Sequence, residues 1–122
     1  RGRVKIDSSV WTYYVGLASG TVTGYAYFDT HLVRTMPETI MAVLEPDGNV
    51  RFVELLAFAE PDDYLPRASW LAQFAGKGDA LDLFVGRGIR NITGASLTSN
   101  TLADSVRRVL AVHEESTRSI VR

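Results

Sequence analysis

The first half of the chain has the alternation of apolar and polar positions that is typical of β-strands. Residues 10–16 (VWTYYVG) and 21–29 (TVTGYAYFD) are rich in aromatic and β-branched side chains, and Ser19-Gly20 lies between them. This pattern predicts a hairpin of two antiparallel strands. Because a glycine inside a strand weakens it unless the backbone needs the space, Gly24 is expected to mark a bulge or a close approach. Side chains alternate along a strand, so one face is expected to carry Val22, Gly24, Ala26 and Phe28, and the other Thr21, Thr23, Tyr25 and Tyr27.

A second hairpin is predicted in residues 38–58 (ETIMAVLEPDGNVRFVELLAF), where a Pro-Asp-Gly turn separates two apolar runs. Pro46 presets its own φ, and Gly48 supplies the left-handed conformation that closes such a turn.

The period then becomes helical. Residues 66–76 (PRASWLAQFAG) begin with Pro66, place Trp70, Leu71 and Phe74 on one face, and stop at Gly76, which predicts one amphipathic helix. Residues 77–89 are expected to form a short strand or an extended link.

A second helix is predicted from about Asn100 to Glu115. Its N-cap is expected to be Ser99 or Thr101, and Asp104 is expected in the first turn, where the helix dipole favours a carboxylate. The apolar positions have the spacing of a half-buried helix, namely Leu102, Val106, Val109, Leu110 and His113.

Four strands in consecutive hairpins followed by helices predict an α+β fold, with an antiparallel sheet covered by helices on one face. A chain of 122 residues that is 46% hydrophobic fits a single domain, residues 1–122, with a core of about 10–115. The longest apolar runs, such as Ile40 to Leu44, are far too short to span a membrane.

Composition narrows the function classes. A net charge of −1 without a basic, aromatic stripe argues against nucleic acid as a partner, and the absence of cysteine removes thiolate chemistry. His31 and His113 are far apart in sequence and have no clustered third ligand, so no metal site is expected, and both are interpreted as ordinary surface or boundary histidines. No catalytic residues are assigned.

The segment TGASLTS (residues 93–99) is the chain's main chemical feature. It leads into the predicted second helix, and the unpaired N–H groups of a helix N-terminus bind anions, phosphate above all. Gly94 and Ala95 leave room for a close approach. The alternative interpretation is structural, with Thr98, Ser99 and Thr101 capping a helix and Gly94 making a turn.

This segment resembles the Ser/Thr-Gly-Ala-Thr/Ser motif of the FMN-binding domain found in sodium-translocating NADH:quinone oxidoreductases, Rnf-type complexes and related membrane regulators. Residues 24–50 resemble the hairpin region of that family, and residues 53–77 resemble its central strand, loop and helix. The resemblance covers about Gly16 to His113. The chain differs from the family in having Ser96 where Thr is usual and Arg90 where an acidic residue is frequent.

The resemblance implies that a flavin transferase attaches FMN to Ser96 as a phosphoester. It also implies that the loop containing Glu60, Tyr64 and Leu65 lies beside the flavin ring. The other residues that it suggests for cofactor binding are Thr93, Gly94, Ala95, Leu97, Thr98, Ser99, Trp70, Arg34 and Thr35. Each of these residues also has a purely structural interpretation. The loop residues would form a turn that enters a helix, Trp70 would pack in the core, and Arg34 would lie at the surface.

The expected function is therefore an FMN-carrying electron-transfer domain, rather than a stand-alone enzyme, in a membrane-associated redox system. The family implies an extracytoplasmic (periplasmic or membrane-associated) location, and partners in a membrane redox complex or among quinone-linked electron-transfer proteins. The alternative is a sensory or protein-interaction module with noncovalent or lost flavin.

Overall fold

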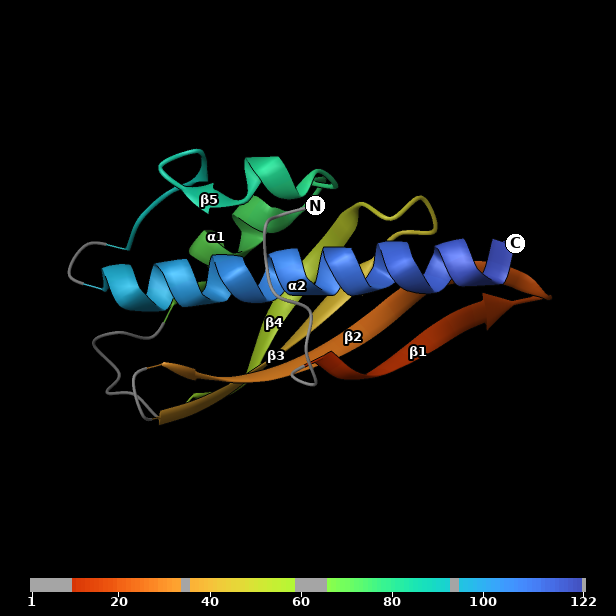
Figure 1. Cartoon of the computed structure of the whole chain (residues 1–122), viewed down its shortest axis with the longest axis horizontal. Coiled ribbons are helices and arrows are strands. Elements are labelled where there is room, and N and C mark those ends of the chain that lie inside the picture. The colour runs from red at the N-terminus through yellow and green to blue at the C-terminus, as the bar shows by residue number, and fades with distance from the viewer. Residues whose placement is uncertain (1–9, 34–35, 59–65, 93–94, 122) are drawn as a thin grey trace.

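A computed structural model describes residues 10–33, 36–58, 66–92 and 95–121 (Figure 1). Its main sheet has four antiparallel strands in the order β1-β2-β3-β4. These strands are β1 (Val10–Ala18), β2 (Thr21–Val33), β3 (Met36–Leu44) and β4 (Val50–Phe58). The two predicted hairpins are confirmed, with β2 extending four residues beyond the predicted end.

Two glycines have the conformations that the sequence required. Gly48 adopts a φ of 92° in the turn between β3 and β4, and its N–H donates to the Glu45 carbonyl at 2.8 Å. Gly24 has a φ of 157° next to a register shift, because Gly16 pairs with Gly24 and Leu17 pairs with Val22. A Cβ at Gly24 would lie 2.7 Å from the Leu44 carbonyl oxygen, so both the bulge and the close approach are confirmed.

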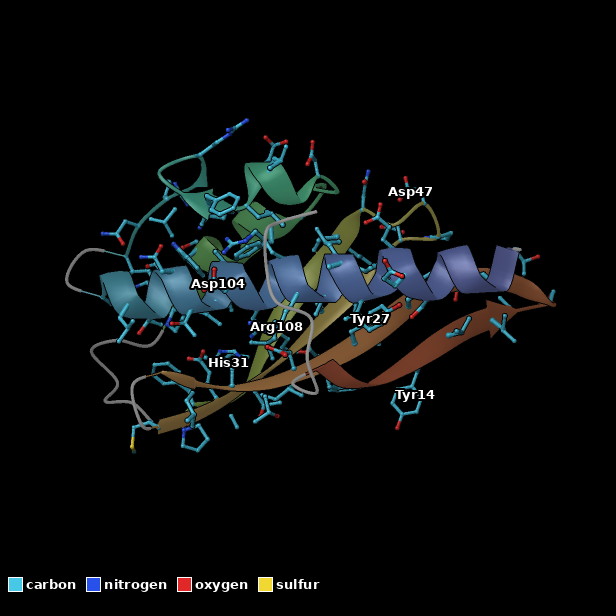
Figure 2. All side chains as sticks on the ribbon, in the orientation of Figure 1. Tyr14, Tyr27, His31, Asp47, Asp104 and Arg108 are labelled. Carbon is cyan, nitrogen blue, oxygen red and sulfur yellow. The ribbon has the colours of Figure 1, made fainter. Side chains whose placement is uncertain are left out.

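The long helix α2 (Ser96–Val121) crosses one face of this sheet (Figure 1). The core lies between the two layers, where the predicted apolar face of α2 meets the sheet, mainly at β2. Figure 2 shows Tyr27 between the layers and Tyr14 on the opposite face of the sheet, directed away from α2. The main buried side chains of this core are Tyr27, Ile40, Leu44, Val50, Val53, Leu102, Val106 and Val109.

The predicted start of the second helix is wrong. It begins at Ser96 instead of near Asn100, so Ser99 and Thr101 are not N-caps and Asp104 lies beyond the first turn. The hydroxyls of Ser99 and Thr101 instead donate to carbonyls four residues back, those of Ala95 (3.1 Å) and Leu97 (2.7 Å). Hydroxyl side chains form hydrogen bonds both inside helices and at helix caps. The residue types alone therefore did not locate the start of α2.

The predicted helix at 66–76 is shorter than expected. It consists of one turn, α1 (Ala68–Leu71), followed by a 3₁₀ turn, η2 (Ala72–Phe74). Gly76, with a φ of 85°, follows the segment as predicted. The link beyond it contains a 3₁₀ turn, η3 (Ala80–Asp82), and a two-stranded parallel pair, β5 (Phe84–Val85) and β6 (Gly88–Ile89).

These segments complete a single α+β domain, as predicted. Within the described residues, no helix has the length and apolar character needed to cross a membrane.

Candidate functional site

The first turn of α2 leaves three backbone amides without an acceptor inside the helix. Ser99 N–H donates to the Ala95 carbonyl at 3.1 Å, which is the first hydrogen bond of the helical pattern. The preceding amides of Ser96, Leu97 and Thr98 therefore come before the i to i−4 ladder begins. Ala95 has only a methyl group and provides no side-chain cap. Residues 95–99 of the motif identified from the sequence thus form the helix N-terminus itself.

The hydroxyl residues of this motif have different environments. Ser99 is fully buried, where its Oγ accepts from the Ile92 N–H at 2.8 Å and donates to the Ala95 carbonyl. Thr98 is buried as well, whereas Leu97 is 42% exposed. Ser99 therefore fixes the chain that enters the helix, while Leu97 is accessible at its surface.

Other predicted site residues fall outside what the structure describes. For Ser96 the structure describes the backbone, as the first residue of α2, but not the side chain. The remaining residues lie outside the described ranges altogether, namely Arg34, Thr35, Glu60, Tyr64, Leu65, Thr93 and Gly94.

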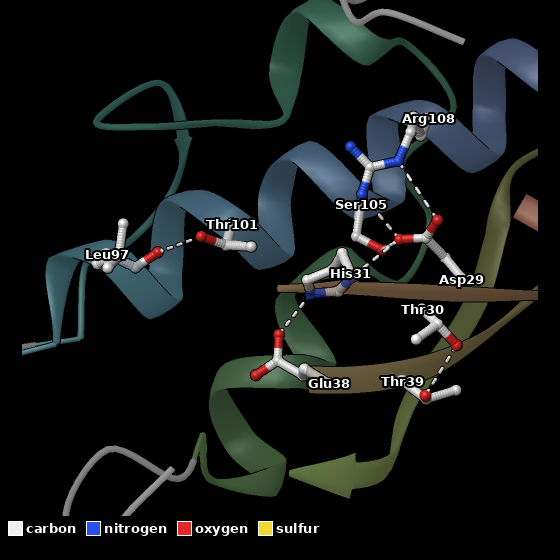
Figure 3. A network of polar contacts seen from close by, with 9 residues as sticks. All are labelled: Asp29, Thr30, His31, Glu38, Thr39, Leu97, Thr101, Ser105 and Arg108. Atoms are coloured by element: carbon white, nitrogen blue, oxygen red, sulfur yellow. Dashed lines mark hydrogen bonds and ion pairs between the residues drawn. The ribbon is translucent and has the colours of Figure 1, made fainter. Parts of the chain in front are cut away.

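β2 ends before residues 34–35 and β3 begins after them, and β4 ends before residues 59–65. These strand ends lie together at one end of the sheet. Glu38, near the start of β3, pairs with Phe58 at the end of β4, and Met36 pairs with Val33 at the end of β2. Figures 1 and 3 show that α2 begins toward this same end.

Contacts between α2 and β2 establish the same arrangement. Tyr27 meets His113 late in α2, and two residues further along β2, Asp29 meets Ser105 and Arg108. The two elements therefore run antiparallel, so that the end of β2 approaches the beginning of the helix.

Trp70 lies in the core next to the segment that leads into the motif. Its ring is edge-on to Phe74, with ring centroids 5.4 Å apart, and its indole N–H donates to the Arg90 carbonyl at 2.6 Å. The Arg90 N–H in turn donates to Gln73 Oε1 at 2.8 Å. These contacts match the core-packing interpretation of Trp70, and contact with a flavin stays a prediction.

A buried polar cluster lies between α2 and the sheet, and sequence reasoning missed it (Figure 3). Asp29 is 0% exposed and accepts hydrogen bonds from the Ser105 hydroxyl, from Arg108 Nη2 at 2.8 Å and from His31 Nδ1 at 2.9 Å. The other nitrogen of the same ring, His31 Nε2, is 2.5 Å from Glu38 Oε1. We call Asp29, His31, Glu38, Ser105 and Arg108 the polar cluster.

Burial acts to raise the pKa of Asp29, but the hydrogen bonds from His31, Arg108 and Ser105 outweigh it and lower this pKa from 3.8 to about 2. Burial acts to lower the pKa of His31, but its hydrogen bonds to Asp29 and Glu38 outweigh burial and raise the pKa above 6.5. The cluster therefore holds charged groups that compensate one another.

His113 has the opposite environment. Tyr27 Oη lies 2.8 Å from His113 Nδ1, and the Tyr25 ring is 4.5 Å from the imidazole, centroid to centroid. Burial lowers the pKa of His113 below 6.5. The expectation of ordinary surface or boundary histidines thus missed two largely buried, hydrogen-bonded rings.

The signal for the cluster was present in the strand pattern. Asp29 and His31 continue the alternate positions of Tyr25 and Tyr27, so all four belong to the face that α2 covers. Polar residues in that register require buried partners. Among the described residues, no group of three or more His, Asp or Glu side chains is arranged to hold a metal ion.

No protein-family model matches the chain, and no curated protein matches it either. The resemblance to the FMN-binding domain therefore depends on the sequence segments named above, above all residues 93–99.

Proposed function

We propose that this protein is an FMN-carrying electron-transfer domain of a membrane-associated redox system, with FMN attached to Ser96 through a phosphoester. The observation that carries the proposal is the position of Ser96 as the first residue of a 26-residue helix. The motif that resembles the flavin attachment sequence coincides with the helix N-terminus, where a phosphate is best accommodated.

The local chemistry fits a phosphodiester. Its negative charge would lie beside the three amides of residues 96–98 that precede the helical hydrogen-bond ladder. An anion at this position also interacts favourably with the helix dipole, typically by about 0.3–1 kcal/mol at an exposed site. Ala95 places only a methyl group before these amides. The residues present therefore fit the phosphate end of the cofactor.

The described residues of the motif take distinct roles in this proposal. Leu97 is exposed and adjacent to the attachment point, where it would pack against the flavin. Thr98 contributes a backbone N–H, and Ser99 holds the turn because its hydroxyl hydrogen is donated to Ala95. The remaining residues proposed for the site are Arg34, Thr35, Glu60, Tyr64, Leu65, Trp70, Thr93 and Gly94.

The attachment step needs a separate enzyme. A serine hydroxyl is a poor nucleophile at neutral pH and requires a base, and no His, Asp or Glu lies within five residues of Ser96 in the sequence. We therefore propose a flavin transferase as a partner. When bound, the flavin supplies the electron-transfer chemistry, while the protein supplies its position and electrostatic surroundings.

Covalent attachment would be useful in an extracytoplasmic location, where dissociated FMN is not readily replaced. We propose that location together with partners in a membrane redox complex or among quinone-linked electron-transfer proteins.

Co-expression with a flavin transferase tests the attachment. After denaturation and washing, the wild-type protein is expected to retain flavin absorbance and fluorescence, and Ser96→Ala is expected to lose both. Ser96→Thr keeps a hydroxyl and is expected to retain flavin. Thr101→Ala, which removes a neighbouring hydroxyl that donates within the helix, is a matched control and is expected to retain it as well.

Equal release of flavin from the wild type and from Ser96→Ala would refute attachment at Ser96. Noncovalent binding is then tested with free FMN, which should raise the Tm of the apoprotein by mass action. The expected stabilisation is about 2.7 kcal/mol at a ligand concentration of 100 times Kd.

A second candidate is a protein-interaction or sensory module. The observation in its favour is an apolar row across the sheet on the face turned away from α2. Tyr14 pairs with Ala26, Ala26 with Val43, and Val43 with Phe52. At the two ends of this row Tyr14 is 63% exposed and Phe52 41%, whereas Val43 between them is 9% exposed, and exposed apolar side chains that gather on one face mark interaction sites. The absence of any thermal shift with FMN, together with a flavin-free purified protein, would favour this candidate.

A further inference from the structure

The polar cluster contains an imidazole with a carboxylate at each nitrogen. His31 Nδ1 is 2.9 Å from Asp29 Oδ2, and His31 Nε2 is 2.5 Å from Glu38 Oε1. Neutral histidine has one N–H and one bare nitrogen, whereas the imidazolium has two N–H groups. Only the imidazolium can donate to both carboxylates at once. The geometry therefore requires a proton in each of the two contacts, His31 Nδ1 to Asp29 and His31 Nε2 to Glu38.

The two carboxylates depend on this ring to different degrees. Asp29 also accepts from Ser105 and from Arg108, so it keeps partners whatever the state of the ring. Glu38 is 1% exposed, and its second oxygen, Oε2, has no hydrogen-bond partner among the described residues. Figure 3 shows this second oxygen directed away from the imidazole. Within the polar cluster, Glu38 forms its hydrogen bond with His31.

We propose that His31 and Glu38 form a buried, exchangeable proton-binding site that controls the attachment of α2 to the sheet. When the site loses its proton, His31 becomes neutral and has a single N–H for the two carboxylates. Its bare nitrogen then faces a carboxylate oxygen, and two acceptors oppose one another at hydrogen-bond distance. The lost proton goes to solvent, and no other reactant takes part.

Loss of this proton leaves the buried cluster with one negative charge too many, which is a costly arrangement. Among the described residues, His31 pairs with two charged groups, Asp29 from β2 and Glu38 from β3. Asp29 in turn pairs with Arg108 from α2. With the proton, these groups and His31 carry two positive and two negative charges. Without it, one buried negative charge is uncompensated.

The site can act on α2 because the cluster joins the sheet to that helix. Arg108 and Ser105 are the helix residues that bind Asp29 directly. An uncompensated negative charge within this attachment favours its opening, because exposure to water would solvate the carboxylates. The proposal requires no flavin and stands independently of the proposed function.

The two histidines allow an internally controlled titration by NMR of the ring resonances in the intact apoprotein. His31 is expected to titrate above pH 6.5 and His113 below it, in line with their opposite environments. In Glu38→Gln the His31 midpoint is expected to fall by about one pH unit or more, because a neighbouring opposite charge is lost. The His113 midpoint is expected to stay where it is.

Amide hydrogen exchange supplies the second measurement. Protection factors around residues 105–108 are expected to fall when the pH passes above the His31 midpoint, and this fall is expected to be smaller in Glu38→Gln. A wild-type His31 midpoint at or below pH 6.5 would overturn the proposal, and so would unchanged protection across the midpoint. If Glu38→Gln does not fold, these two wild-type measurements decide the question alone.

Discussion

Asp29→Asn is the substitution for which the structure gives the clearest expected magnitude. Asp29 is fully buried and binds Ser105, Arg108 and His31 at the junction of β2 and α2. Asparagine has nearly the same shape, so the substitution leaves the packing in place and removes the charge. Two buried cations then lose the carboxylate that they share.

The pKa shift of Asp29 gives the size of the effect. A change from 3.8 to about 2 corresponds to about 2.5 kcal/mol, since each unit is worth about 1.4 kcal/mol. Removing one partner of a buried ion pair typically costs about 3–5 kcal/mol. We therefore expect the free energy of unfolding to fall by about 3 kcal/mol, a large part of the 5–15 kcal/mol that is typical of a domain.

Urea unfolding followed by circular dichroism measures this loss at neutral pH. Glu54→Gln is the matched control, because Glu54 is an exposed carboxylate on the same sheet and its loss should change stability by less than about 0.5 kcal/mol. A loss of less than about 1 kcal/mol in Asp29→Asn would show that the buried carboxylate does not stabilise the fold as argued.

The pH dependence has a defined sign. The folded pKa of Asp29 is lowered, so its contribution is complete above pH 3.8 and is lost as the pH falls toward about 2. The folded pKa of His31 is raised, so its contribution is complete below pH 6.5 and is lost as the pH rises through the folded value. Together they contribute most between pH 3.8 and 6.5. Asp29→Asn should therefore lose less stability on acidification to pH 2 than the wild type does.

Two further substitutions test the backbone and the core. Gly24→Ala is expected to cost about 2 kcal/mol or more, because its Cβ would lie 2.7 Å from the Leu44 carbonyl oxygen. Gly20→Ala, which has a positive φ but open space, should cost less, and equal losses in thermal unfolding would contradict the close approach. Trp70→Phe leaves the Arg90 carbonyl without its donor and is expected to cost about 1–3 kcal/mol by calorimetry. An unchanged Tm would show that this hydrogen bond contributes nothing.

The candidate site was predictable in part. The motif at residues 93–99 was found from the sequence alone, and the structure places its last four residues in the first turn of α2. The roles of its hydroxyls were not predictable, because Ser99 binds Ile92 and Ala95 within the fold. Attachment of FMN to Ser96 stays a prediction until flavin retention is measured.

The sequence by itself determined the two hairpins, the turn at Gly48, the bulge at Gly24 and the apolar face of α2. These features follow from local rules, namely the periods of strands and helices and the φ angles that glycine allows. Only the tertiary structure decided where α2 begins, how short α1 is, and that Asp29 meets Arg108. Those outcomes depend on burial and on charge pairing between distant segments, which a local pattern does not encode.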